Sequence, residues 1–198
     1  MRGAGGWGGC RVRLTGVALA LAAATASVAG AAAAVPAFST ASPHVVQGQP
    51  AAGSCHARGR GLFILPDRRC TPGLRNPAAV QARITATICA AGWTTRVRPP
   101  ESITEPEKRA SMAAYGDRGP LSAYEYDHLI PLELGGAVNA AGNLWPEPDY
   151  PHHAGVYANP KDRLEDALHR LVCAGRLRLL AAQELIATNW VAAYRTYG

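Results

Sequence analysis

Apolar residues recur at helical spacing in the middle of the chain. The first such stripe consists of Val80, Ile84, Ile88 and Ala91. Asn76 is a suitable cap, and Pro77 suits the first helical position, where a missing N–H group costs nothing. Gly92 follows the last apolar residue, as glycine often does where a helix ends. The pattern therefore predicts a helix over residues 76–91.

Three more helices are expected downstream. Residues 105–115 begin with charged side chains and stop before Gly116, which predicts a short helix. A second apolar stripe, which ends before Gly175, consists of Leu164, Ala167, Leu168, Leu171 and Val172. A third, over residues 179–197, consists of Ala182, Ile186, Trp190 and Ala193. Such one-sided stripes are typical of helices that bury one face.

Alternating positions predict strands in two other places. Residues 93–98 (WTTRVR) are rich in β-branched side chains and stop at two prolines, so a short strand is expected there. Residues 124–128 and 143–145 suit a pair of strands, because Gly135 and Gly136 supply a turn between them. The tryptophans at positions 93, 145 and 190 are expected in the core rather than at a binding surface.

The N-terminal region has the order of a secretory signal. Arg2, Arg11 and Arg13 precede a run of small apolar residues, and the alanines at 31–34 suit a signal-peptidase cut. We expect a signal peptide over residues 1–36, with no stable membrane insertion after its cleavage. Residues 37–53 are rich in Ser, Pro, Gly and Gln, which predicts a disordered linker. One domain is then expected over residues 54–198.

Charge and cysteine content support export. The predicted signal holds three arginines and no acid, so its removal lowers the formal charge from +6 to +3. Four cysteines remain after Cys10 is removed, and an even number in an exported chain predicts two disulfides. None of the four has another within three positions, unlike the ligands of a zinc ribbon. We favour Cys55 with Cys70 and Cys89 with Cys173, because the second pair would join two helices.

The segment YEYDHLIPLELGGAVNAAGNLWPEP carries the candidate chemistry. It resembles the HNH endonucleases of the ββα-metal superfamily, in which a D-H-(I/L)-x-P-L-x-x-G-G stretch and a later N-L precede a helix that completes a metal site. The resemblance covers about 40 of the 198 positions. It implies an α+β fold: a small, mainly helical domain built around a hairpin-helix metal motif and stapled by disulfides.

Phosphodiester hydrolysis needs a deprotonated water as the nucleophile. It also needs a positive charge that stabilises the negative charge developing on the phosphate. His128 suits the first task, since neutral imidazole takes a proton near neutral pH. Asp127 suits the second as a ligand of a hard divalent cation. Neighbours on a strand point to opposite faces, so this pair serves one site only where the strand ends. The resemblance gives Asn143 the role of steadying the hairpin or the histidine.

The helix-borne metal ligand departs from the family pattern. Asp162 and Asn159 are the two candidates, although Asn159 before Pro160 is also an ordinary helix cap. His152 and His153 compete from a proline-rich loop. The expected cofactor is Mg²⁺ or Mn²⁺, with Zn²⁺ or Ni²⁺ as alternatives.

Basic side chains near the motif are candidates for phosphate contacts, since such contacts supply most nucleic-acid affinity. They are Arg96, Arg98, Lys161 and Arg163, although each one taken alone is more typical of a solvated surface charge. Glu125 and Glu133 belong either to the surroundings of the site or to the solvent face of a half-buried strand.

The sequence thus predicts an exported divalent-metal endonuclease that cleaves DNA, or RNA, with little sequence preference. The alternative is a non-enzymatic secreted or cell-envelope module that keeps the hairpin as a scaffold after loss of the metal site. A third reading, a toxin or its accessory, has no translocation or receptor domain in its support. The sequence gives no indication of oligomeric state.

Overall fold

The computed structural model describes residues 1, 3–6, 8, 35–149 and 159–198. The chain divides into two units, Met1–Ala32 and Ala33–Gly198, and every helix and strand named below belongs to the second. Most of the predicted signal peptide lies outside the described residues, as do Cys10, His152 and His153. In the described part of the chain, no helix is long and apolar enough to cross a membrane.

The second unit combines helices with two small antiparallel sheets, an arrangement compatible with the α+β class. Its strands are β1 (Arg58–Arg60), β2 (Phe63–Leu65), β3 (Tyr124–His128) and β4 (Leu144–Pro148). Its α-helices are α1 (Trp93–Val97), α2 (Glu101–Tyr115), α3 (Pro160–Cys173) and α4 (Leu179–Tyr197). Short 3₁₀ helices are η1 (Gln81–Ala86), η2 (Leu121–Ala123) and η3 (Leu132–Leu134).

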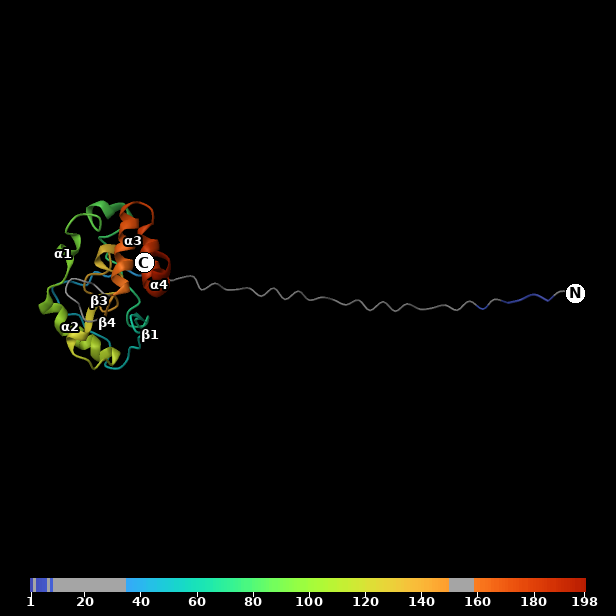
Figure 1. Ribbon diagram of the computed structural model, residues 1–198, viewed down its shortest axis with the longest axis horizontal. Coiled ribbons are helices and arrows are strands. Elements are labelled where there is room, and N and C mark those ends of the chain that lie inside the picture. The colour runs from blue at the N-terminus through green and yellow to red at the C-terminus, as the bar shows by residue number, and fades with distance from the viewer. Residues whose placement is uncertain (2, 7, 9–34, 150–158) are drawn as a thin grey trace. The chain divides into compact units, whose positions relative to one another are not determined.

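The β3–β4 hairpin is the centre of this unit. β3 pairs with β4, α2 packs against β4, and α3 packs against α4 (Figure 1). The predicted strand pair is confirmed as β3 and β4. The helices expected at 105–115 and 179–197 are confirmed as α2 and α4, and the apolar stripe that ends before Gly175 lies in α3. α2 begins four residues earlier than expected, and α4 is kinked at Asn189, whose backbone is not helical.

Two predicted elements are wrong. Residues 93–97 form α1 rather than a strand, because the described strands pair only as β1–β2 and β3–β4 and leave no partner for them. The helix expected over residues 76–91 is reduced to η1. The chain turns at Thr87, whose φ is −122° and ψ is −109°, and this turn carries Cys89 to its disulfide with Cys173.

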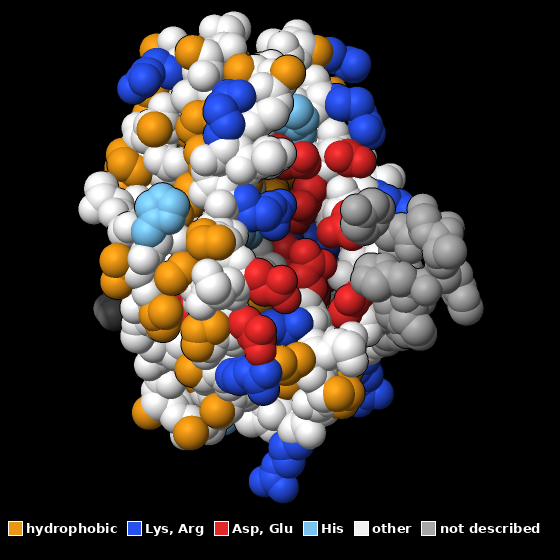
Figure 2. Space-filling view, turned by 90° about the vertical axis from the view of Figure 1, so that its left-hand side faces the viewer, with side chains coloured by type: hydrophobic (Ala, Val, Ile, Leu, Met, Phe, Trp, Pro, Cys, Tyr) orange, Lys and Arg blue, Asp and Glu red, His pale blue; other side chains and the backbone are white. Residues whose placement is uncertain are grey.

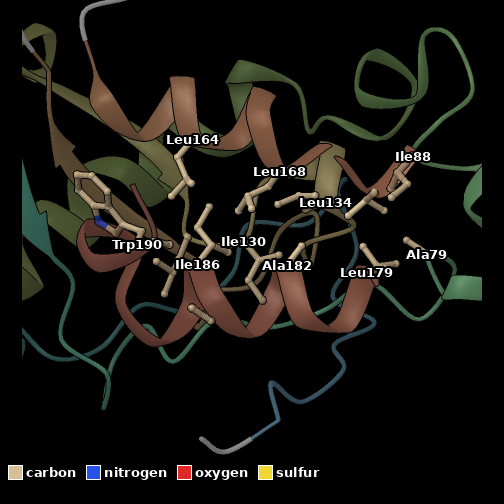
Figure 3. Close-up of a cluster of buried hydrophobic side chains, with 14 of the residues drawn as sticks. Ala79, Ile88, Ile130, Leu134, Leu164, Leu168, Leu179, Ala182, Ile186 and Trp190 are labelled. Carbon is tan, nitrogen blue, oxygen red and sulfur yellow. The ribbon is translucent and has the colours of Figure 1, made fainter. Parts of the chain in front are cut away.

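The hydrophobic core lies between α3, α4 and the loop that follows β3. Leu164 and Leu168 of α3 face Ala182 and Ile186 of α4, with Ile130 between the two helices (Figure 3). Trp145 and Trp190 are fully buried, and Trp93 packs at the edge of the same cluster, so the core assignment of the tryptophans is confirmed. Burial of apolar side chains of this size contributes about 1.5–3 kcal/mol each.

Residues 36–49, here called the N-terminal arm, pack on this domain. The backbone of Ser39 donates to the Arg75 carbonyl, that of Arg75 donates to Ala37, and the Arg75 guanidinium lies over the Phe38 ring. The prediction of a disordered linker over residues 37–53 is therefore wrong. Composition misses these contacts because they are mostly backbone and polar hydrogen bonds.

Two disulfides join Cys55 to Cys70 and Cys89 to Cys173, which is the pairing favoured from the sequence. The first closes the loop that contains the β1–β2 hairpin. The second ties the turn after η1 to the end of α3. Disulfides are typical of proteins in an oxidising extracellular environment.

Candidate active site

The register of the β3–β4 hairpin gathers acidic side chains on one face. Glu125 lies opposite Glu147, and Asp127 lies opposite Trp145. Residues two apart on a strand share a face, and so do residues directly opposite each other in an antiparallel pair. Glu125, Asp127 and Glu147 therefore point to the same side of the hairpin.

The loop between β3 and β4 is held by Asn143. The Asn143 side chain is fully buried; its amide donates to the carbonyls of Ile130 and Ala137, and its oxygen accepts from the backbone of Ile130 and Leu74. None of its side-chain hydrogen bonds goes to the His128 ring. Of the two roles expected for Asn143, these hydrogen bonds match the one that steadies the hairpin.

The glycine pair in this loop is required by geometry. Gly135 ends η3 with φ of +71°, a left-handed backbone that other residues rarely adopt. A Cβ at Gly136 would lie 1.7 Å from the Ile130 carbonyl oxygen. Any side chain at this position would thus push the loop away from β3.

His128 is the last residue of β3 and is 6% exposed. Its Nε2 lies 3.0 Å from the Val138 carbonyl oxygen. A carbonyl only accepts, so Nε2 carries the proton and Nδ1 is left as the basic nitrogen. Burial lowers the pKa of His128 to about 4. The imidazole is therefore neutral at neutral pH, as a proton acceptor must be.

Lys161, in the first turn of α3, is fully buried against the acidic face. Its ammonium lies 2.6 Å from Asp127 Oδ2, pairs with Glu165, and donates to the His128 carbonyl at 2.9 Å. The Asp127 Oδ2 atom also accepts from the Trp145 indole at 3.3 Å. The expectation that Lys161 contacts substrate phosphate is thus wrong, because its charge has no solvent-exposed surface and is already paired.

A cavity of about 290 Å³ opens beside this ion-pair cluster. Its acidic lining consists of Glu125, Asp127, Glu133, Asp162, Glu165 and Asp166. His128, Arg98 and Arg163 also line it. Figure 2 shows acidic side chains gathered in a hollow on one face of the molecule, with cationic side chains beside them. His128 and Asp127 both line this cavity because β3 ends at His128, which is the condition expected from the sequence for neighbouring residues to share one site.

The carboxyl groups around the cavity hold protons more strongly than usual. Burial and the neighbouring Asp127 raise the pKa of Glu125 to about 7 and that of Glu147 well above its ordinary value. Burial also raises the pKa of Asp162 and Glu133. For Lys161, burial works against the charge, but Asp127, Glu165 and Glu147 outweigh it and raise the pKa. The cluster has more acid than Lys161 alone neutralises.

The structure separates the two candidates for the helix-borne ligand. Asp162 lines the cavity, whereas Asn159 is buried at the start of α3 and does not line it. Among the basic candidates, Arg98 and Arg163 line the cavity, while the Arg96 guanidinium is occupied with the Ala91 carbonyl at 2.7 Å. Arg98, Arg163 and Asp162 thus stay with the site, and Asn159 and Arg96 do not.

No family model, no curated protein and no solved structure matches this chain.

The cavity offers the donor type that a hard divalent cation prefers, although no three of its described carboxylates lie within 4.8 Å of one another. Carboxylate oxygens are the ligands that Mg²⁺ and Mn²⁺ prefer. Oε1 of Glu133, in the cavity wall, is buried and has no hydrogen-bond partner among the described residues. Within residues 35–149 and 159–198, three His, Cys or acidic ligand atoms come within 4.8 Å of one another only at Cys89, His169 and Cys173. The sulfurs there are bonded to each other, so this group offers no thiolate.

Three acids of the site were not singled out from the sequence. Glu147 is found from the strand register, since it lies opposite Glu125. Glu165 lies one helical turn after Lys161, and this spacing is the signal that could have found it. Asp166 lies outside the apolar stripe of α3, and it lines the cavity from an exposed position.

Proposed function

We propose that this protein is an exported, divalent-metal-dependent endonuclease of the HNH type. One observation carries the proposal: a buried, neutral His128 with a fixed tautomer lies beside Asp127 and Asp162 in one acidic cavity. A histidine with a shifted pKa beside carboxylates in a cavity marks a candidate functional site. The motif around Asp127 and His128 adds the reaction class.

Asp127 and Asp162 would hold the cation, with Glu133, whose Oε1 has no hydrogen-bond partner among the described residues, as a further oxygen donor. A bound Mg²⁺ or Mn²⁺ would neutralise charge on the phosphate and orient it. Lys161 already neutralises one oxygen of Asp127, so a single cation would meet a site with reduced negative charge. This favours moderate affinity and a metal that exchanges with solvent.

His128 would act as the general base. Its Nε2 proton is engaged with Val138, so Nδ1 is the atom available to take a proton from water. Arg98 and Arg163, at the cavity wall, would contact the phosphates on either side of the scissile bond. Such contacts read no bases, in keeping with cleavage at many sequences.

The decisive experiment is plasmid cleavage by the purified protein in Mg²⁺ or Mn²⁺, with EDTA as the metal-free arm. His128→Ala is expected to lower the rate at least a hundredfold, as loss of a general base does. His56→Ala is the matched control, because His56 is exposed and distant in sequence from His128. This variant should cleave like the unmodified protein. Undiminished cleavage by His128→Ala would refute the assignment.

A non-enzymatic role is the second candidate, and one contact favours it. The Lys161 ammonium pairs with Asp127, the first candidate ligand, at 2.6 Å. A lysine that replaces a lost metal would leave the hairpin as a scaffold. Titration with Mn²⁺, followed by calorimetry, separates the two candidates. The nuclease proposal predicts Mn²⁺ binding that Asp127→Asn weakens, whereas a non-enzymatic scaffold predicts no Mn²⁺ binding.

A further inference from the structure

We infer that the N-terminal arm positions His128: through Asn139, it holds the Val138 carbonyl that fixes the histidine tautomer. The inference rests on the proposed function for its catalytic meaning, but the geometry is independent of it. Asn139 is therefore a positioning residue, and the arm is part of the site.

Asn139 and Glu107 together hold the N-terminal arm, and this pair with its hydrogen bonds is here called the clamp. Asn139 is fully buried, and its amide donates to the carbonyls of Ser42 and Val45 at 3.1 and 3.0 Å and to Glu107 Oε1 at 3.0 Å. Glu107, on α2, is 1% exposed and also accepts from the backbone of Gln47 at 2.6 Å. One asparagine and one glutamate thus join the arm, α2 and the β3–β4 loop.

The clamp residue Asn139 directly follows Val138, whose carbonyl oxygen contacts His128 Nε2. Earlier parts of the same loop are held by the backbone, where Asn76 donates to Gly135 and Ala137 donates to Leu74. The N–H groups of Val138 and Asn139 make no backbone hydrogen bond within the described ranges. Asn143 holds Ala137 on one side, and the Ala140 carbonyl accepts from the backbone of Asn143 and Leu144 on the other. Between them, the Asn139 side chain adds the hydrogen bonds that hold residues 138 and 139, which present the Val138 oxygen to His128.

The arm also reaches the strand that carries the candidate site. Gln49 donates to the Tyr126 hydroxyl at 3.0 Å, one residue before Asp127. Its contacts are thus adjacent in sequence both to the Asp127–His128 pair and to the carbonyl partner of His128. Val45 and Val46 remain exposed, so these polar contacts, and not apolar burial, attach this part of the arm.

A histidine base works only when its other nitrogen is held. If the Val138 oxygen moves, Nε2–H loses its partner and the Nδ1–H tautomer becomes populated, which removes the lone pair that accepts the proton. For metal-bound histidines, loss of the partner that orients the ring costs about 10–100-fold in metal affinity or activity, and we expect a change toward the lower end of that range here.

The test uses the full chain with Asn139→Ala, which opens the clamp, and Gln47→Pro, which removes the arm's N–H donor to Glu107 together with the Gln47 side chain and its hydrogen bond to the Val45 carbonyl. Asn189→Ala, the same chemical change at the α4 kink, is the control. Nitrogen-15 NMR of the His128 ring reports the tautomer directly, and plasmid cleavage is measured in parallel.

We expect the unmodified protein and Asn189→Ala to show only Nε2–H. Both clamp variants should show a clear Nδ1–H population and about tenfold slower cleavage. If the unmodified protein does not cleave DNA, the proposed function fails while the tautomer still decides this inference. A wild-type His128 tautomer in folded Asn139→Ala and folded Gln47→Pro would overturn it.

Discussion

Lys161 shows how a single side chain reorganises the expected site. Its four-carbon stem and ammonium are taken entirely out of water, where an unpaired charge would be very costly. Pairing with Asp127 and Glu165 and donation to the His128 carbonyl offset that cost. A lysine in a first helical turn usually reads as a surface charge, so nothing in the local sequence pattern reveals this burial.

Replacement of Lys161 by Met is expected to destabilise the protein by about 3–5 kcal/mol, because it leaves Asp127 and Glu165 buried without a counter-charge. Urea unfolding at neutral pH measures this. Arg163→Met is the control on the same helix; its side chain is exposed, and a change within about 0.5 kcal/mol is expected. A loss below about 1 kcal/mol for Lys161→Met would contradict the buried ion-pair cluster.

The elements differ in how far sequence pattern determines them. α2, α3, α4 and the β3–β4 hairpin were predictable because each buries one periodic apolar face or follows a turn signal. Residues 93–97 were not, since their β-branched residues favour a strand only where a partner strand exists. The pairing of Lys161 with Asp127 and the clamp at Asn139 join residues distant in sequence, which no local pattern encodes.

The segment after β2 allows a prediction about pH. Asp67 is 7% exposed and accepts from the Arg69 side chain, the Arg69 backbone and the His56 backbone, and these bonds hold its pKa well below its usual value. A carboxyl with a depressed folded pKa stabilises above its unfolded pKa, and that stability is lost as pH falls through the folded pKa.

Asp67→Asn is therefore expected to cost about 1–3 kcal/mol at neutral pH, with the difference from the unmodified protein shrinking as pH falls below about 4. Arg69→Ala should cost no more than about 1 kcal/mol, because the Arg69 side chain is 74% exposed. Guanidinium unfolding from pH 2 to pH 7 checks both. A cost for Asp67→Asn that does not change with pH would be inconsistent with an ionised Asp67 anchor.

On the scale of the whole molecule, the two disulfides constrain very different lengths of chain. Cys55–Cys70 spans 15 residues, whereas Cys89–Cys173 spans 84 and encloses α1, α2 and the hairpin. Their contribution is largely a restriction of the unfolded chain, which grows with loop length.

Removal of the Cys89–Cys173 bridge by a double Cys→Ala substitution is expected to cost about 4–5 kcal/mol, and removal of the Cys55–Cys70 bridge about 3 kcal/mol. Denaturant midpoints of the two double variants, each read against the oxidised parent, give the comparison. Equal or reversed losses would show that native contacts at the bridges outweigh loop length.

The buried ammonium of Lys161 has a consequence for how the protein meets its surroundings. Since the Lys161 ammonium neutralises the buried carboxylates of Asp127 and Glu165, folding does not require an external cation. Small domains that fold only around zinc or calcium differ in this respect. The fold is therefore expected to be equally stable with and without added divalent metal, and under the proposed function the metal would be needed for cleavage alone.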